Sequence, residues 1–424
     1  MDDDWDVPSK LAVVTGSTSG IGKETAAALA ALGATVVLAC RNVELAAQVA
    51  ADIRRQHPGS KVEVGPQLDL ASQRSVRRFA QEWAGGGRPI NILVNNAGAN
   101  HHGEPWHTED GVGGLCQVNY LGPYTLTRLL EPVLLASAPA RVVNVSSVTH
   151  RYGRAPTSLA TFLQDWRQGS YYPTTKLANV LFAYELQRRL GAHGIQSCAV
   201  EPGGVATSIW KGSRFSRPPL SWVINFLYAP PRDGAQAVIH AATMPWGADR
   251  RQAQQVNARW ASRYRKASAL GSNTSTNGSS AGGRHSWHSL GGAKRGARQL
   301  SSSSGASESS DGRSSNGLID AQHDFRFYAK GLFASPWVTN WRGVPTRGPL
   351  DQARGVVWGL GTIVCSLLDW PIRNLSNGRW QSHVRCVPAA PLSYDEQLAK
   401  GLWEVSAEVA GVPVKPAVPT KQQP

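Results

Sequence analysis

The sequence has few cysteines, and they are widely scattered. The five cysteines are spread over 424 residues, and none forms a CxxC pair or a Cys/His cluster with the spacing of zinc ligands. We therefore expect no metal site, and we expect the thiols to be reduced, as they are in a reducing compartment.

The sequence also has no apolar run long enough to cross a membrane. The run GVVWGLGTIVCSLL at residues 355–368 has 14 residues, whereas a transmembrane helix needs about 18 or more. We interpret this run as a buried helix or as an element that lies on a membrane surface.

A secretory signal is missing as well. The first residues, MDDDWDVPSK, contain neither the basic n-region nor the apolar h-region of a signal peptide, and their acidic character disfavours a transit peptide. We expect the mature chain to begin where the sequence begins and to be cytoplasmic. Contact of residues 355–368 with a membrane surface is the alternative, and it would make the protein a peripheral membrane protein.

The positive charge of the sequence is concentrated in one segment. The net charge is +15, and residues 250–313 supply +9 of it, with 11 Lys and Arg against 2 Asp and Glu. That segment lacks a regular basic and aromatic face, so we expect no nucleic-acid partner. A content of 41% hydrophobic residues is enough for a sizeable core, which excludes a chain that is disordered throughout.

Apolar segments alternate with amphipathic helical patterns over the first half of the chain. The strand candidates are residues 11–14, 35–39, 61–68, 90–94, 141–145 and 196–200. This alternation predicts an α/β fold with a Rossmann-type, doubly wound parallel sheet, which binds ligands at the carboxyl ends of its strands. We assign residues 9–245 to this core and to the catalytic residues.

The second half of the chain differs in composition. Residues 268–316 are rich in Ser, Gly, Asn and Arg, and they contain little that can form a core. We therefore predict a single domain with a disordered insertion at 246–320. The fold can tolerate such an insertion, because lengthening a surface loop costs little free energy. Residues 321–411, with a strand at FRFYAKGLF and a helix at 394–409, complete the fold and the substrate region, and residues 412–424 form a loose tail.

A glycine-spaced turn joins the first strand to the first helix in LAVVTGSTSGIG, residues 11–22. Gly16, Gly20 and Gly22 can adopt backbone angles that other residues avoid, and they let the main chain approach a pyrophosphate at a helix N-terminus. The pattern predicts a dinucleotide site. A plain turn is the alternative explanation of the glycine cluster alone.

Four polar residues stand at positions where they could take part in proton transfer. In YPTTK, Tyr172 and Lys176 project from the same helix face, and a nearby ammonium favours the phenolate and lowers the pKa of a tyrosine. Ser147 ends the apolar strand RVVNVSS, where a hydroxyl could bond a substrate carbonyl. Asn119, in QVNYLG, is a poor helix former within a predicted helix, which suggests a bend or a held water. Chance spacing and a partly buried helix Asn are the alternatives.

The motifs TGSTSGIG, NNAG, QVN, VVNVSS, YPTTK and PGGVAT occur in this order, and with them the chain resembles the short-chain dehydrogenase/reductase family from residue 11 to about 243. The resemblance implies a single Rossmann domain that binds NAD or NADP. It implies that Tyr172 is the general acid/base and that Lys176 lowers the pKa of Tyr172 and holds the nicotinamide ribose. It also implies that Ser147 polarises the substrate carbonyl and that Asn119 positions a water in the proton relay.

The resemblance also implies a cofactor site. Residues 95–98 line the adenosine side, Asp69 contacts adenine, and Pro202, Gly203 and Thr207 face the nicotinamide. The predicted cofactor-binding residues are Gly16, Ser17, Ser19, Gly20, Ile21, Gly22, Arg41, Asp69, Leu70, Asn96, Ala97, Gly98, Tyr172, Lys176, Pro202, Gly203, Val205 and Thr207.

The residue after the second strand bears on the choice of cofactor. Arg41 stands where an acidic residue would bind the ribose 2′-hydroxyl of NAD, and a cation there suits the 2′-phosphate of NADP. We therefore expect NADP, with NAD as the second choice. A solvated Arg41 at a strand end is the alternative.

Further features narrow the branch of the family. The 25-residue separation of Ser147 and Tyr172, and the phrases SSVTH, KLANVLF and LAKGLWEVS, are similar to the retinol dehydrogenase-like branch and its plant and algal relatives. Apolar residues after PGGVAT predict a lipophilic substrate entrance or a helix that packs over the site or against a partner. These residues are Trp210, Phe215, Trp222, Phe226 and Leu227.

We predict an NADP-dependent short-chain alcohol dehydrogenase or carbonyl reductase. It would transfer a hydride between the nicotinamide and a carbonyl or alcohol carbon of a lipophilic small molecule, such as a retinal-, prenyl- or steroid-like compound. The alternative is an NADP-binding sensor or scaffold with little turnover. Dimers and tetramers are frequent in the family that the chain resembles, so a homo-oligomer is one possible state of this protein.

Overall fold

The fold is built on a sheet of strands in the order β3-β2-β1-β4-β5-β6-β7-β8. In this computed structural model, the structure describes residues 5–100, 106–153, 171–207, 209, 218, 228–246, 326–330, 384–386, 389 and 391–418. The strands are β1 (Leu11–Thr15), β2 (Thr35–Ala39), β3 (Lys61–Val64), β4 (Ile92–Asn95), β5 (Ala140–Val145), β6 (Ile195–Glu201), β7 (Arg326–Lys330) and β8 (Val384–Cys386).

The predicted Rossmann-type α/β fold is confirmed, with differences at the strand ends. All neighbouring pairs from β3 to β7 are parallel, and the edge strand β8 runs antiparallel to β7. An antiparallel edge strand on a parallel sheet is common in this class. The strand expected at 61–68 ends at Val64, before Gly65 and Pro66, because proline cannot donate to the ladder.

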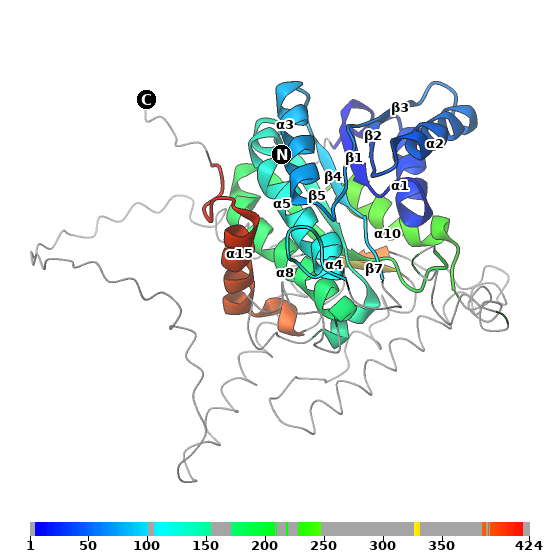
Figure 1. The fold of residues 1–424 in the computed structure, drawn as a ribbon. Helices are drawn as coiled ribbons and strands as arrows, with labels where there is room; N and C mark the ends of the chain where they lie inside the picture. Colours follow the sequence, from blue (N-terminus) through cyan, green and yellow to red (C-terminus); the bar gives the residue numbers. More distant parts are fainter. Residues whose placement is uncertain are drawn as a thin grey trace, which may run out of the picture.

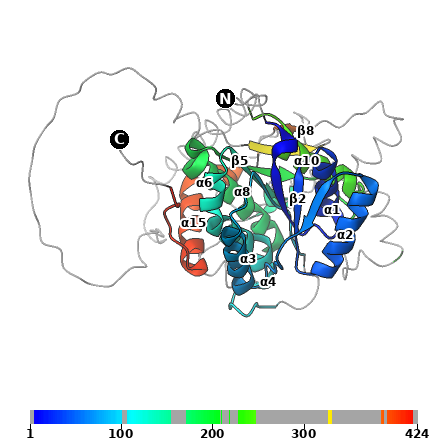
Figure 2. The same ribbon diagram turned by 90° about the horizontal axis from the view of Figure 1, so that it is seen from above.

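Helices cover both faces of the sheet, as Figures 1 and 2 show. Side chains cap three of them: Asn42, Ser72 and Asp395 accept hydrogen bonds from backbone N–H groups of the first turns of α2, α3 and α15. The longer helices are α1 (Gly20–Ala31), α2 (Val43–Gln56), α3 (Gln73–Gly85), α5 (Gly122–Leu129), α8 (Tyr171–Leu190), α10 (Pro231–Thr243) and α15 (Glu396–Ala410).

Side chains that alternate along the strands pack into two separate hydrophobic cores, one on each face of the sheet. In β1, Leu11 and Val13 point to the core formed with α3, α5, α8 and α15, whereas Ala12 and Val14 point to the core formed with α1, α2 and α10. Figure 2 shows α1, α2 and α10 on one side of the sheet and α3, α8 and α15 on the other. The apolar character of β1 at every position is therefore explained by burial of both faces.

The C-terminal helix α15 completes one core, lying beside α8 (Figure 1). The Trp403 side chain is only 1% exposed and packs edge-on against Tyr124, with ring centroids 5.5 Å apart. Its Nε1 donates to the carbonyl of Val414 at 2.8 Å.

The first part of the tail differs from the loose segment that its composition predicts. Arg128 Nη2 donates to the carbonyl of Pro413 at 2.6 Å, and the backbone N–H of Ala417 donates to Glu131 Oε2 at 3.2 Å. Two buried charged side chains on the α5 side thus hold residues 413–417, a long-range contact that the local sequence does not encode.

Several predicted features lie outside the described residues. They are the insertion beyond residue 246, the apolar run at 355–368, and the proposed entrance residues Trp210, Phe215, Trp222, Phe226 and Leu227. Within the described part of the chain, no helix is both long and apolar enough to cross a membrane.

Replacing Trp403 with alanine tests the role of α15. We expect Trp403→Ala to lower the free energy of unfolding by about 3–5 kcal/mol, because it leaves a cavity between α15 and α8. Chemical denaturation measures this value. The control is Leu32→Ala, at a side chain that is 46% exposed, and it should change stability by less than about 0.5 kcal/mol. A loss below about 1 kcal/mol in Trp403→Ala would show that the fold does not depend on this contact.

Candidate active site

The carboxyl ends of β1, β4, β5 and β6 meet at one cavity of about 670 Å³. Seventeen of the predicted cofactor-binding residues and Ser147 line it. The lining residues among them are Gly16, Ser19, Gly20, Ile21, Gly22, Arg41, Asp69, Leu70, Asn96, Ala97, Gly98, Ser147, Tyr172, Lys176, Pro202, Gly203, Val205 and Thr207.

Two predicted site residues, Ser17 and Asn119, lie behind the cavity wall. Ser17 is fully buried, its Oγ donates to the carbonyl of Val14 at 3.0 Å, and it lies 3.1 Å from Cys40 Sγ. Ser17 therefore shapes the turn from inside. Asn119 is also fully buried, and its Oδ1 accepts a hydrogen bond from the N–H of Ala99, which lines the cavity.

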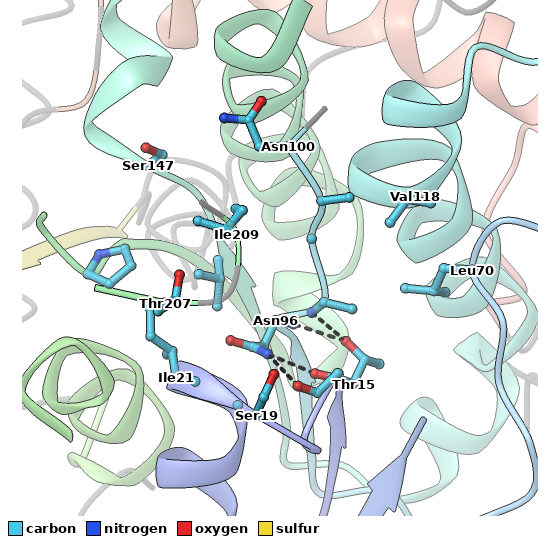
Figure 3. Close-up of a pocket in the computed structure, with 18 of the residues that line it drawn as sticks. Thr15, Ser19, Ile21, Leu70, Asn96, Asn100, Val118, Ser147, Thr207 and Ile209 are labelled. Carbon is cyan, nitrogen blue, oxygen red and sulfur yellow. Dashed lines mark hydrogen bonds between the residues drawn. The ribbon is translucent and has the colours of Figure 1, made fainter. Parts of the chain in front are cut away.

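The glycine turn lies against the end of β4. Gly16 has φ +65°, and a Cβ there would be 2.8 Å from Ala97 Cα, while a Cβ on Gly22 would be 2.4 Å from Asn96 Nδ2. Asn96 Nδ2 donates to the carbonyl of Thr15 at 2.9 Å, and the Asn96 N–H donates to Thr15 Oγ1 at 3.0 Å, as the dashed lines in Figure 3 show. The turn thus places the N-terminus of α1 at the cavity. The N–H groups and the dipole of a helix N-terminus favour binding of an anion there.

The end of β2 forms another part of the wall. Arg41 is exposed and lines the cavity, and its carbonyl accepts a hydrogen bond from Gln67 Nε2 at 3.0 Å. Nearby, Asp69 Oδ1 accepts the N–H of Ala71 at 2.9 Å, which fixes the orientation of this carboxylate. A cation and a carboxylate therefore border the same cavity.

Tyr172 and Ser147 line the same cavity, and the nearby Ser147 side chain favours the phenolate form of Tyr172. Lys176 is 3% exposed, and its Nζ lies 5.6 Å from the centroid of the Tyr172 ring. The ammonium donates to the carbonyl of Val145 at 3.1 Å. The residues that the YPTTK and VVNVSS motifs suggested are thus brought together.

Burial dominates the protonation of this group. It raises the pKa of Tyr172 to about 12, against the opposing effect of the nearby Ser147 side chain, and it lowers the pKa of Lys176 to about 8. The sequence predicted that Lys176 would lower the pKa of Tyr172, whereas in the structure the pKa of Tyr172 is raised. Here Lys176 Nζ is directed to a backbone carbonyl, and desolvation outweighs its charge.

Asn119 lies in a π-helical turn, Gln117–Leu121, which explains an asparagine in a helix. Its Oδ1 accepts the N–H of Ala99 at 2.7 Å, and its Nδ2 donates to Thr175 Oγ1 at 3.2 Å. A Cβ on Gly98 would be 3.2 Å from Lys176 Nζ and 3.4 Å from Asn119 Oδ1. The glycine leaves space beside both polar groups.

Other lining residues were not predicted. Thr149 donates its hydroxyl to Ser147 Oγ at 3.1 Å, and its place two residues after that serine was a usable signal. Trp106 lies over Gly114, where a Cβ would be 2.1 Å from the indole ring. Its place at the cavity depends on a turn between His107 and Gly113, and the Asp110–Gly111 pair was a usable signal for that turn.

Comparison with known proteins identifies the family. Residues 10–217 match the family described as short chain dehydrogenase. The chain is 40% identical over 237 residues to human retinol dehydrogenase 11, covering 56% of this chain and 73% of that protein. It is 41% identical over 241 residues to human retinol dehydrogenase 12, covering 56% and 74%. The chain belongs to the short-chain dehydrogenase family.

Membership makes the protein an oxidoreductase with an NAD(P)-binding Rossmann fold, and it confirms the resemblance to retinol dehydrogenases. The comparisons do not support the expected plant and algal character. The fold is also similar to the crystal structure of an uncharacterised protein from Mycobacterium paratuberculosis, with a TM-score of 0.52 and 23% identity over 95% of this chain and 94% of that one.

The buried lysine makes a testable contribution to stability. Since the pKa of Lys176 falls from 10.5 to about 8 on folding, the unfolded state binds more protons between these values, and stability rises with pH across that interval. We expect Lys176→Met to stabilise the cofactor-free fold by about 3 kcal/mol at pH 7, with the gain disappearing by pH 10.5.

Denaturation of both proteins across this pH range measures the difference. The exposed Lys61→Met serves as the control and should show no pH-dependent gain. A stability difference that does not change with pH would contradict the assigned desolvation of Lys176.

Proposed function

We propose that this chain reduces a carbonyl of a lipophilic small molecule with NADPH, and oxidises the corresponding alcohol with NADP. The observation that carries the proposal is the pair of hydroxyl side chains, Ser147 and Tyr172, which line the same cavity as the glycine turn, with Lys176 beside Tyr172. A hydroxyl pair at one end and an anion-binding helix N-terminus at the other suit a dinucleotide and a small carbonyl.

The residues present fit a nicotinamide dinucleotide. The turn from Gly16 and the N-terminus of α1 would hold the pyrophosphate, and the Asp69 carboxylate would border the adenine. Space beside Gly98, where a Cβ would crowd Lys176 and Asn119, would admit the nicotinamide ribose. The exposed guanidinium of Arg41 supports NADP over NAD, because it can pair with a 2′-phosphate.

The bound cofactor would supply the hydride, and the protein would handle the proton. Because burial keeps the pKa of Tyr172 near 12, its hydroxyl is protonated at neutral pH and can donate to a carbonyl oxygen. Ser147 would donate a second hydrogen bond to that oxygen. The Lys176 ammonium would stabilise the phenolate that remains, and Asn119 would position a water for reprotonation.

The apolar part of the cavity supports a lipophilic substrate. Val148 follows Ser147, and Ile209 and Val118 also line the site; Figure 3 shows Ile209 near Ser147 and Val118 across the cavity. The similarity to proteins named retinol dehydrogenase 11 and 12 also supports a retinal-like aldehyde as the first compound to test.

Removing the Tyr172 hydroxyl tests the proposal. We expect Tyr172→Phe to lower kcat for NADPH-dependent reduction of retinal by at least about 100-fold, because it removes the hydroxyl that would donate the proton to the carbonyl oxygen. Absorbance of NADPH measures the rate. The neighbouring Tyr171→Phe is the matched control and should keep most of the activity, since Tyr171 lacks the four-residue spacing to Lys176. Equal rates for both variants would refute the assigned role.

Removing the Arg41 charge tests the choice of cofactor. We expect Arg41→Ala to lower kcat/KM for NADPH about 10- to 100-fold, because a charge-assisted hydrogen bond contributes about 1.5–3 kcal/mol. The value for NADH should stay within a factor of three, about 0.7 kcal/mol. Arg55→Ala, at an exposed arginine paired with Asp52, is the control. An equal loss for both cofactors would mean that Arg41 does not recognise the 2′-phosphate.

A further inference from the structure

A buried ion pair joins the turn that follows Ser147 to the end of β6. Arg151 belongs to the 3₁₀ turn η3 (Val148–Tyr152), which follows Ser147, and Glu201 is the last residue of β6. Arg151 Nη1 donates to Glu201 Oε2, and the two side chains are 2% and 0% exposed. Neither side chain lines the cavity, but both adjoin segments that do.

Stability alone is a poor explanation of this pair. Removing two charges from water costs free energy that a buried pair regains only with good geometry and a full set of hydrogen bonds. Glu201 Oε1 is buried, and no group in the described part of the chain donates to it. Burial raises the pKa of Glu201 although Arg151 opposes the shift. An incompletely bonded buried pair points to a positional role.

The pair closes a short loop that contains Ser147. At its start, the N–H of Ser146 donates to the carbonyl of Val200 at 2.8 Å, which ties the loop to β6. In its middle, the N–H of His150 donates to the carbonyl of Ser147 at 3.0 Å. At its end, Arg151 returns to Glu201 on the same strand. The serine therefore lies between two attachments to β6, the strand that leads into Pro202 and Gly203.

We propose that the Arg151–Glu201 ion pair is a positioning device that holds the Ser147 hydroxyl in place beside Tyr172 at the cavity. This inference rests on the function proposed above, because it concerns the substrate end of the same site. Arg151 and Glu201 act through Ser147 and do not touch the substrate.

A double variant, Arg151→Met with Glu201→Met, tests the proposal. It removes both charges at similar volume, so no unpaired buried charge is left to prevent folding. We expect a cooperative unfolding transition and an unchanged Kd for NADPH. We also expect a kcat for retinal lowered about 10- to 100-fold, since a small misplacement of a positioning group has effects of this size. Hydrogen exchange of the amides of residues 147–153 should accelerate.

A second buried ion pair provides the matched control. Arg128 and Glu131 are each 1% exposed and lie away from the residues that line the cavity. The double variant Arg128→Met with Glu131→Met should leave kcat and the exchange of residues 147–153 unchanged. If both double variants slow turnover equally, the effect is a general loss of packing, and the proposal is overturned.

Combination with Ser147→Ala shows whether the pair acts through the serine. We expect the Arg151/Glu201 double variant to cause no further loss of kcat in the Ser147→Ala background. If Ser147→Ala slows turnover and the ion-pair variant does not, this inference fails and the proposed function stands. If the unmodified protein reduces no carbonyl, the proposed function fails, and unchanged hydrogen exchange in the ion-pair variant would then refute the positioning role independently.

Discussion

Parallel hydrogen bonding of β1, β4, β5 and β6 is the constraint on which the site depends. Each of these strands points the same way, so the segments that follow them begin at one edge of the sheet. The glycine turn, the NNAG segment, Ser147 and the PGGVAT segment come from widely separated parts of the chain and share one cavity for this reason. Gly16 and Gly22 complete the arrangement, because any side chain at either position would collide with the end of β4.

Burial sets the chemistry at the substrate end of that cavity. The surroundings that raise the pKa of Tyr172 also lower the pKa of Lys176, so the two groups keep a protonated phenol and a readily titrated amine side by side. The arrangement has a stability cost, since a charged lysine is held out of water. Proton donation by a buried phenol beside a second hydroxyl is the chemistry that this arrangement favours.

The sequence predicts the parts of this structure that depend on local patterns. Periodicity locates β1 and β2, glycine spacing predicts the turn before α1, and the YPTTK spacing brings Tyr172 and Lys176 onto one helix face. Parts that depend on distant contacts were missed. The edge strand β8, the attachment of residues 413–417 to Arg128 and Glu131, and the Arg151–Glu201 pair all join segments far apart in the chain.

The most direct test of catalysis at this cavity is NADPH and NADH oxidation by the purified protein with a panel of lipophilic aldehydes and ketones, together with cofactor titration by fluorescence. We expect saturable cofactor binding and turnover of at least one carbonyl, with NADPH preferred. Tight cofactor binding without turnover of any compound would contradict a catalytic role for the Ser147–Tyr172 pair and would favour a protein that senses or displays its cofactor.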